Sequence, residues 1–176
     1  MPETVLPRYE LHEGKLHIVA EPTLDHQHLT KLLIRNLSEQ IEDVGAGYVF
    51  PPVDVVLSDN TTVAPDIVVV RAEKAGILHP LRIYGVPDIV VEALSTNRGD
   101  DLVRKRQLYA AAGVPEYWIL DGDADTLTAL ELAEDGTYHE RAVLTAADTL
   151  TTQLFPEFNL PLAQLFEHPA RIRQQE

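Results

Sequence analysis

The chain contains no cysteine among its 176 residues. This absence excludes disulfide bonds, thiolate metal sites and a cysteine nucleophile, so any metal ion must be held by oxygen atoms or imidazole nitrogens. It is also consistent with a reducing cytoplasm, where we expect the protein to be located. No apolar run approaches the roughly 20 residues that span a bilayer, and Met1–Val5 lack the basic and apolar regions of a signal peptide. We therefore expect a soluble protein.

Basic residues are scarce. The chain has 14 Lys and Arg against 28 Asp and Glu, which gives a net charge of −14 at neutral pH. Nonspecific nucleic-acid binding depends on neutralising phosphates with basic side chains, so this charge argues against a protein that coats nucleic acid. A local basic site is still compatible with it. The length and the 45% hydrophobic content predict a single globular domain over residues 1–176.

Several common site motifs are absent. The sequence has no phosphate-binding P-loop, no dinucleotide fingerprint, no Gly-x-Ser-x-Gly elbow and no His-Glu-x-x-His zinc helix. Ser95 follows an apolar stretch and could be a nucleophile, but the N-cap of the following helix is its commoner role.

Apolar and polar residues alternate on both sides of Glu13 and Gly14, which predicts a β-hairpin over residues 8–20. Apolar residues then recur at steps of three and four, which predicts a helix over residues 25–43. We expect Asp25 to be its N-cap, and Gly45 and Gly47 to end it. A second helix is predicted from Thr96 to Ala112.

Stretches rich in Val, Ile and aromatic residues predict the strands. These are Tyr48–Leu57, Asp66–Val70, Asp88–Leu94 and Glu116–Leu120. Ile67–Val70 and Ile89–Val91 are apolar on both faces, so we expect them in the centre of a sheet with other elements packed on each side.

The C-terminal third contains a predicted hairpin formed by Asp125–Leu132 and Gly136–Val143. The segment Phe155–Phe166 should wrap around the core, and Arg171–Glu176 should be frayed. Together these elements predict an α/β fold: a central mixed sheet flanked by the two helices, with an N-terminal and a C-terminal β-hairpin.

Two carboxylates lie in or beside the central strands. An unpaired ionised group costs several kcal/mol to bury, yet Glu92 lies within the apolar stretch Ile89–Leu94. If the strand that Asp66 opens is its neighbour, the two carboxylates converge at one end of the sheet and could hold a hard divalent cation. The alternative is that Glu92 ends a strand that reaches water. Asp88 would lie roughly 13 Å from Glu92 along the strand and is better explained as a turn residue.

A helical projection places Lys105 in the centre of the apolar face of the second helix, whereas Arg104 and Arg106 lie nearer the solvent. Lys105 could extend its ammonium group to the rim of the core, or it could meet Glu92. The same projection places His26 in the buried stripe of the first helix and turns His28 away. His26 is therefore either a core or capping residue or part of the site.

Four sequence blocks carry a resemblance. They are Pro65–Val69, Pro87–Ser95, Asp101–Tyr109 and Ala112–Trp118. They closely resemble the Uma-type restriction endonuclease family, a bacterial branch of the PD-(D/E)XK nuclease superfamily. The resemblance covers nearly the whole chain, including Tyr9-Glu10-Leu11, and it implies a restriction-endonuclease-like fold.

The resemblance also implies a site. Asp66 and Glu92 match the two metal-binding acids, which with the backbone carbonyl of Ala93 would hold Mg²⁺, with Mn²⁺ as a substitute. The superfamily usually places its lysine two residues after the second acid, where this chain has Leu94. Lys105 would supply the ammonium group from the helix instead. His26 would match an additional polar site residue.

The function implied is metal-dependent hydrolysis of phosphodiester bonds, in DNA. Residues 98–106 contain Arg98, Arg104, Lys105 and Arg106 against Asp100 and Asp101, a local charge of 4 − 2 = +2 that suggests limited phosphate contact. One alternative is a catalytically inactive binding or assembly protein with the same fold. Another is a hydrolase of a small phosphodiester. The resemblance and the apolar, proline-rich tail also predict a homodimer.

Overall fold

The computed structural model describes residues 8–19, 21–94 and 99–171, and of residues 99–101 it describes the backbone alone. The elements in chain order are β1 (Arg8–His12), β2 (Lys15–Val19), α1 (Leu24–Leu37), β3 (Gly47–Phe50), β4 (Val55–Ser58), β5 (Thr61–Val63), β6 (Ile67–Arg71), β7 (Ile83–Tyr84), β8 (Ile89–Ala93), α2 (Gly99–Ala112), β9 (Glu116–Asp121), β10 (Thr126–Leu132), β11 (Tyr138–Leu144), β12 (Thr149–Thr152), β13 (Phe155–Pro161) and α3 (Ala163–Phe166). A π-helical turn, Ser38–Glu42, continues α1, and a 3₁₀ segment, Ala72–Ile77, follows β6. None of the described helices is long and apolar enough to cross a membrane.

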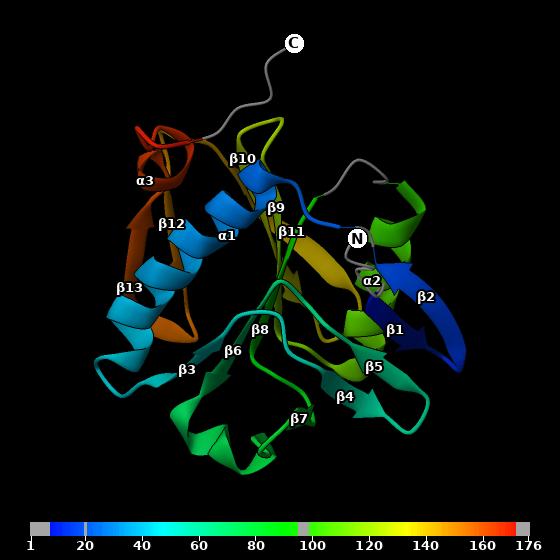
Figure 1. The fold of residues 1–176 in the computed structure, drawn as a ribbon. Helices are drawn as coiled ribbons and strands as arrows, with labels where there is room; N and C mark the ends of the chain where they lie inside the picture. The colour runs from blue at the N-terminus through cyan, green and yellow to red at the C-terminus, as the bar shows by residue number, and fades with distance from the viewer. Residues whose placement is uncertain (1–7, 20, 95–98, 172–176) are drawn as a thin grey trace, which may run out of the picture.

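The central sheet has six strands in the order β11-β10-β9-β8-β6-β3 (Figure 1). The neighbours β8 and β9 are parallel and are connected through α2, whereas the other pairs are antiparallel. A second sheet, β2-β1-β5-β4-β7, contains the N-terminal hairpin, and β12 pairs with β13. The predicted α/β fold with a central mixed sheet is therefore confirmed.

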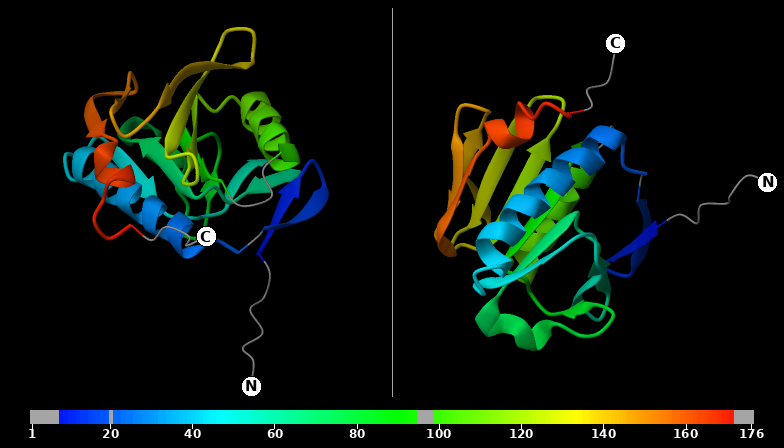
Figure 2. Two further views of the ribbon diagram at one scale, coloured as in Figure 1. Left: turned by 90° about the horizontal axis from the view of Figure 1, so that it is seen from above. Right: turned by 60° about the vertical axis from the view of Figure 1, so that its left-hand side comes forward.

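The central strands divide the core into two layers. Ile67, Val69 and Val91 pack on the α1 side, in a cluster that includes Leu33. The alternate residues Val68, Val70 and Val90 pack on the other side, with Tyr109 of α2. Successive side chains of a strand point to opposite faces, so strands that are apolar on both faces require a layer on each side. Figure 2 shows α1 and α2 on different sides of the sheet.

The first helix differs from the prediction at its ends. Thr23, not Asp25, is the N-cap, because its side chain accepts a hydrogen bond from the backbone N–H of His26. The helix continues through its π-helical turn to Glu42, and Gly45 follows with a φ of 75°. Gly47 instead begins β3, where an added Cβ would lie 2.6 Å from the carbonyl oxygen of Val70.

The single strand predicted over Tyr48–Leu57 is wrong. The structure divides it into β3 and β4, which belong to different sheets. Pro51 and Pro52 lie between them, and proline has no N–H to continue a ladder. The short strands β5 and β7 were not predicted.

The C-terminal elements close one side of the molecule. The predicted hairpin is β10 and β11, which form one edge of the central sheet. The segment Phe155–Phe166 wraps the core as expected, as β13 and α3, and it buries Phe158, Leu160 and Phe166. The apolar side chains of this tail are therefore used within the protomer and do not support a dimer interface.

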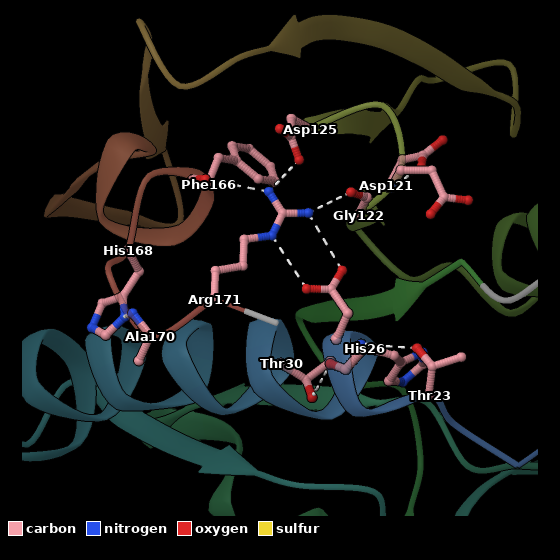
Figure 3. Close-up of polar contacts among 12 residues, drawn as sticks. Thr23, His26, Thr30, Asp121, Gly122, Asp125, Phe166, His168, Ala170 and Arg171 are labelled. Atoms are coloured by element: carbon pink, nitrogen blue, oxygen red, sulfur yellow. Dashed lines mark hydrogen bonds and ion pairs between the residues drawn. The ribbon is translucent and has the colours of Figure 1, made fainter. Parts of the chain in front are cut away.

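Arg171 was predicted to be frayed, but its side chain is only 4% exposed. Its guanidinium group binds both carboxylate oxygens of Asp25 at 3.2 and 3.3 Å, and it also binds Asp125. It donates to the carbonyl oxygens of Gly122 and Phe166 as well (Figure 3). One arginine thus connects the end of the described chain to α1 and to the β9–β10 turn. Residues 172–176 lie outside the described residues, as do Ser95 and the predicted helix start at Thr96.

We predict that Arg171→Met lowers the free energy of unfolding by about 2 kcal/mol, because it removes a buried cation that binds both Asp25 and Asp125. Urea denaturation measures the change. The control is Arg35→Met, since Arg35 lies 4.0 Å from Glu39 in an exposed pair and its loss should cost less than about 0.5 kcal/mol. Equal effects of the two substitutions would contradict the prediction.

A buried carboxylate, that of Glu116, lies at the start of β9. Glu116 accepts hydrogen bonds from the indole N–H of Trp118 and from the hydroxyl of Thr152, so it connects the central sheet to β12. Burial raises the pKa of the Glu116 carboxyl, and these hydrogen bonds offset only part of that increase.

We predict that Glu116→Gln stabilises the protein at pH 8. Above pH 4.5, the ordinary pKa, the unfolded carboxyl ionises more readily than the buried one, so ionisation favours the unfolded state. Glutamine does not ionise, so the gain should disappear as the pH falls below 4.5. Thermal melts at pH 4 and pH 8 measure this, with Glu140→Gln on the exposed face of β11 as control. A gain that is independent of pH would contradict it.

Candidate active site

The strand register brings Asp66 and Glu92 to the same end of the central sheet. Strands β6 and β8 pair Ile67 with Val91 and Val68 with Val90. Asp66 directly precedes β6 and Glu92 follows Val91, so the two residues lie at the same end of the sheet, where the backbone N–H of Ala93 donates to Asp66. The convergence that the sequence predicted is therefore present.

Both carboxylate oxygens of Asp66 have partners. The Nε2–H of His26 donates to Oδ1 at 3.0 Å, and the backbone N–H of Ala93 donates to Oδ2 at 2.8 Å. The Asp66 side chain is 20% exposed. The other ring nitrogen of His26, Nδ1, is buried and has no hydrogen-bond partner among the described residues. His26 thus contacts the site from α1 and fixes the position of one of its acids.

Glu92 is held from α2. The Lys105 ammonium donates to its Oε1 atom at 2.9 Å, and the Tyr109 hydroxyl donates to the same atom at 2.6 Å. Burial raises the pKa of Glu92 to about 7; the positive charge of Lys105 opposes the increase, whereas the negative charges of Asp66 and Glu10 add to it. Additional positive charge beside Glu92 would therefore favour its ionised form.

The position of Lys105 decides between its two interpretations. The residue is only 7% exposed, so its ammonium group does not reach the rim of the core. It meets Glu92 instead. Lys105 and Tyr109 are four residues apart on α2, which places both side chains on the same face of the helix.

Glu10 was not predicted as a site residue. It lies on β1, it is 3% exposed, and its Oε1 atom is 3.5 Å from the Lys105 ammonium and 2.9 Å from the backbone nitrogen of Ala64. Burial raises the pKa of Glu10, but the hydrogen bond from His12, the charge of Lys105 and the N–H of Ala64 together lower it to about 2. The sequence carries no signal for it, because the alternation in β1 predicts that Tyr9 and Leu11 face the core, whereas the structure buries Glu10 and His12 and exposes Tyr9.

Two residues set aside in the sequence lie away from this site. His28 packs edge-on against His168, with ring centroids 5.6 Å apart, and does not join His26. Asp88 precedes β8 at the opposite end of the sheet. It is fully buried and accepts hydrogen bonds from Arg71 and Lys74, so it is a neutralised structural carboxylate rather than an ordinary turn residue.

The basic segment predicted to contact phosphates is largely engaged within the protein. Arg104 donates to the ring of His12, Arg106 donates to the carbonyl oxygen of Tyr138, and Lys105 is buried. Arg98 lies outside the described residues. The described part of α2 therefore offers less positive charge to a ligand than its sequence suggests.

The donor set is compatible with a hard divalent cation. Among the described residues, no three His, Cys, Asp or Glu side chains are grouped so as to hold a metal ion. Mg²⁺ commonly uses one or two carboxylates and keeps several waters, which two acids at a sheet end can provide. The raised pKa of Glu92 also favours cation binding at this position, since a cation would stabilise the charged form of the carboxyl.

The fold defined by these elements is that of the restriction-endonuclease-like nucleases. A crystal structure described as "a putative nuclease belonging to DUF820 from Anabaena variabilis ATCC 29413" superimposes with a TM-score of 0.76 at 19% identity, covering 92% of this chain and 90% of that one. The type IIG restriction endonuclease BpuSI gives a TM-score of 0.46 at 11% identity, covering 78% of this chain and 15% of BpuSI.

Residues 1–163 match the model of the Uma2 family, whose description is "Putative restriction endonuclease". The chain belongs to this family, which confirms the resemblance seen in the sequence. No curated protein matches the chain.

We predict that Lys105→Met lowers the free energy of unfolding by about 3 kcal/mol, measured by urea denaturation in EDTA, because it leaves Glu10 and Glu92 buried without their shared cation. Lys31→Met is the control, since Lys31 is exposed on α1. A loss of less than 1 kcal/mol would show that the buried pair is not important for stability.

Proposed function

We propose that this protein is a single-domain, Mg²⁺-dependent endonuclease that hydrolyses phosphodiester bonds in DNA, with Mn²⁺ able to replace Mg²⁺. The observation that carries the proposal is the position of Asp66 and Glu92 at the same end of the central sheet, with the Lys105 ammonium 2.9 Å from Glu92. Two acids and one ammonium group at one end of a sheet are suited to phosphoryl chemistry, which requires charge stabilisation and a positioned nucleophile. Membership of the Uma2 family supports this reaction class.

Asp66 and Glu92, with the backbone carbonyl of Ala93, would hold the metal ion. When bound, such an ion neutralises negative charge on the phosphate and makes a water more acidic. His26 and the N–H of Ala93 keep the Asp66 carboxylate in place. Tyr109 does the same for Glu92. The Lys105 ammonium stabilises the negative charge that develops on the phosphoryl oxygens.

A hydrolase of small phosphodiesters is the second candidate, and the charge favours it. The chain carries −14, and the described cations of α2 bind partners within the protein. A long DNA footprint would require several exposed Lys and Arg side chains.

Homodimerisation stays an expectation from the resemblance alone, because the apolar side chains of the C-terminal tail are buried in the protomer.

The test combines metal titration and cleavage. Wild type, Asp66→Asn and Glu92→Ala are titrated with Mg²⁺ and Mn²⁺ by calorimetry, and plasmid nicking is then measured at saturating metal. We expect both substitutions to abolish detectable metal binding and to reduce nicking by at least about 100-fold. Glu39→Gln, an exposed carboxylate on the π-helical turn, is the matched control.

The outcomes separate the candidates. Metal binding with nicking that nucleotides do not inhibit supports the DNA endonuclease. Metal binding without nicking, together with hydrolysis of a small phosphodiester, favours the second candidate. If wild type binds no divalent metal even with DNA present, the metal-dependent proposal is wrong, and the acids and the lysine form a structural network.

A further inference from the structure

A series of polar side-chain contacts connects the N-terminal hairpin to the candidate site. The Nε–H of Arg104 donates to Nδ1 of His12 at 3.0 Å. The other ring nitrogen of His12 lies 2.9 Å from Oε2 of Glu10. The Oε1 atom of Glu10 lies 3.5 Å from the Lys105 ammonium. Arg104 and Lys105 are neighbours on α2, so this series of contacts begins on α2, passes through two residues of β1 and ends on α2 again. The β1–β2 hairpin lies beside α2 (Figure 1).

The direction of each hydrogen bond follows from the chemistry of the groups. A guanidinium group only donates, so Nδ1 of His12 must accept and cannot carry a proton. A neutral His12 then has its proton on Nε2, which donates to Glu10. His12 also stacks on the ring of His17 at a centroid distance of 4.5 Å, which restricts its rotation. The tautomer and the orientation of His12 are therefore both determined by neighbours.

Glu10 consequently acts only as an acceptor. It accepts hydrogen bonds from the N–H of Ala64 and from His12 and forms an ion pair with Lys105, and all three contacts favour its ionised form. Lys105 thus lies between two carboxylates, Glu10 on β1 and Glu92 on β8. A lysine held by Glu92 alone could follow any movement of that side chain, whereas a second, fixed carboxylate restrains the ammonium from another direction.

We propose that Glu10, oriented by His12 and Arg104, is the positioning residue for Lys105, and that the β1–β2 hairpin is therefore a functional part of the site. The catalytic consequence depends on the function proposed above, but the placement of the ammonium does not. Glu10 acts through Lys105 and needs no contact with the substrate.

The first test is spectroscopic and needs no activity. A hydrogen-bonded, buried ammonium group should give a slowly exchanging ¹H–¹⁵N signal, identified by its absence in Lys105→Met. We expect Glu10→Gln to remove or shift this signal. Glu13→Gln, on the exposed turn of the same hairpin, should leave it unchanged. The ¹⁵N shifts of His12 should report the tautomer protonated at Nε2.

Glu10→Gln could simply unfold the hairpin, so Arg104→Met provides a second variant. It leaves Glu10 intact but frees the tautomer of His12, and we expect a smaller shift of the Lys105 signal in the same direction. An unchanged Lys105 signal in a folded Glu10→Gln protein would overturn the proposal, and so would a wild-type His12 protonated at Nδ1.

The second test uses cleavage. At saturating metal, Glu10→Gln should reduce the nicking kcat by roughly 10- to 100-fold, with KM and metal affinity within twofold of wild type. Because Glu10 acts through Lys105, the double variant Glu10→Gln/Lys105→Met should be no slower than Lys105→Met. Additive losses would overturn the positioning role. If wild type does not nick DNA, the proposed function fails, and the spectroscopic test still decides whether Glu10 positions Lys105.

Discussion

The buried ammonium group of Lys105 is the interaction on which the candidate site depends. Glu10 lies on β1, Glu92 lies on β8 and Asp66 precedes β6, and the negative charges of Glu10 and Asp66 both raise the pKa of the buried Glu92. Like charges that interact in this way oppose folding unless a cation lies among them. Lys105 contacts two of these three carboxylates, and the hydrogen bonds to Asp66 hold the third. The helix α2, the hairpin β1–β2 and the central sheet therefore meet around a single charge. The helix contributes the ammonium group of Lys105, and the hairpin and the sheet contribute the carboxylates of Glu10 and Glu92 that it binds.

A comparison of the two ends of β8 shows why one end is a candidate site and the other is not. Asp88 precedes the strand and is buried, but it accepts from the backbone N–H and the guanidinium group of Arg71 and from Lys74. Its charge is fully compensated within the protein. Glu92, four residues further along, shares one ammonium group with Glu10, and burial keeps its pKa at about 7. A buried carboxylate that the protein leaves incompletely compensated is typical of functional sites, whereas the Asp88 cluster has the character of a structural ion pair.

The parts of this structure that were predictable from the sequence follow from local periodicity. Apolar runs on both faces identify β6 and β8 as central strands, and a helical projection turns Lys105 inward before any partner is known. The parts that were not predictable depend on contacts distant in sequence. The side chain of Arg171 is ordered by Asp25, 146 residues away, and Glu10 becomes a site residue only because β1 pairs with β5 and meets α2. Thr23 and Asp25 are both good N-cap residues, and in the structure Thr23 caps the helix whereas Asp25 binds Arg171.

The strong negative charge of the chain is consistent with a site of this kind. Phosphodiesters are anionic, and a protein with a charge of −14 repels them over most of its surface. The described cations of α2 do not offset this repulsion, since Arg104 orients His12 and Arg106 binds a backbone carbonyl. Under the proposed function, the site itself would attract the substrate, because a divalent cation on Asp66 and Glu92 would add to the charge of Lys105. The same acidity that disfavours extended nucleic-acid contact favours cation binding, so metal binding and substrate binding would be coupled through electrostatics rather than through a separate binding surface.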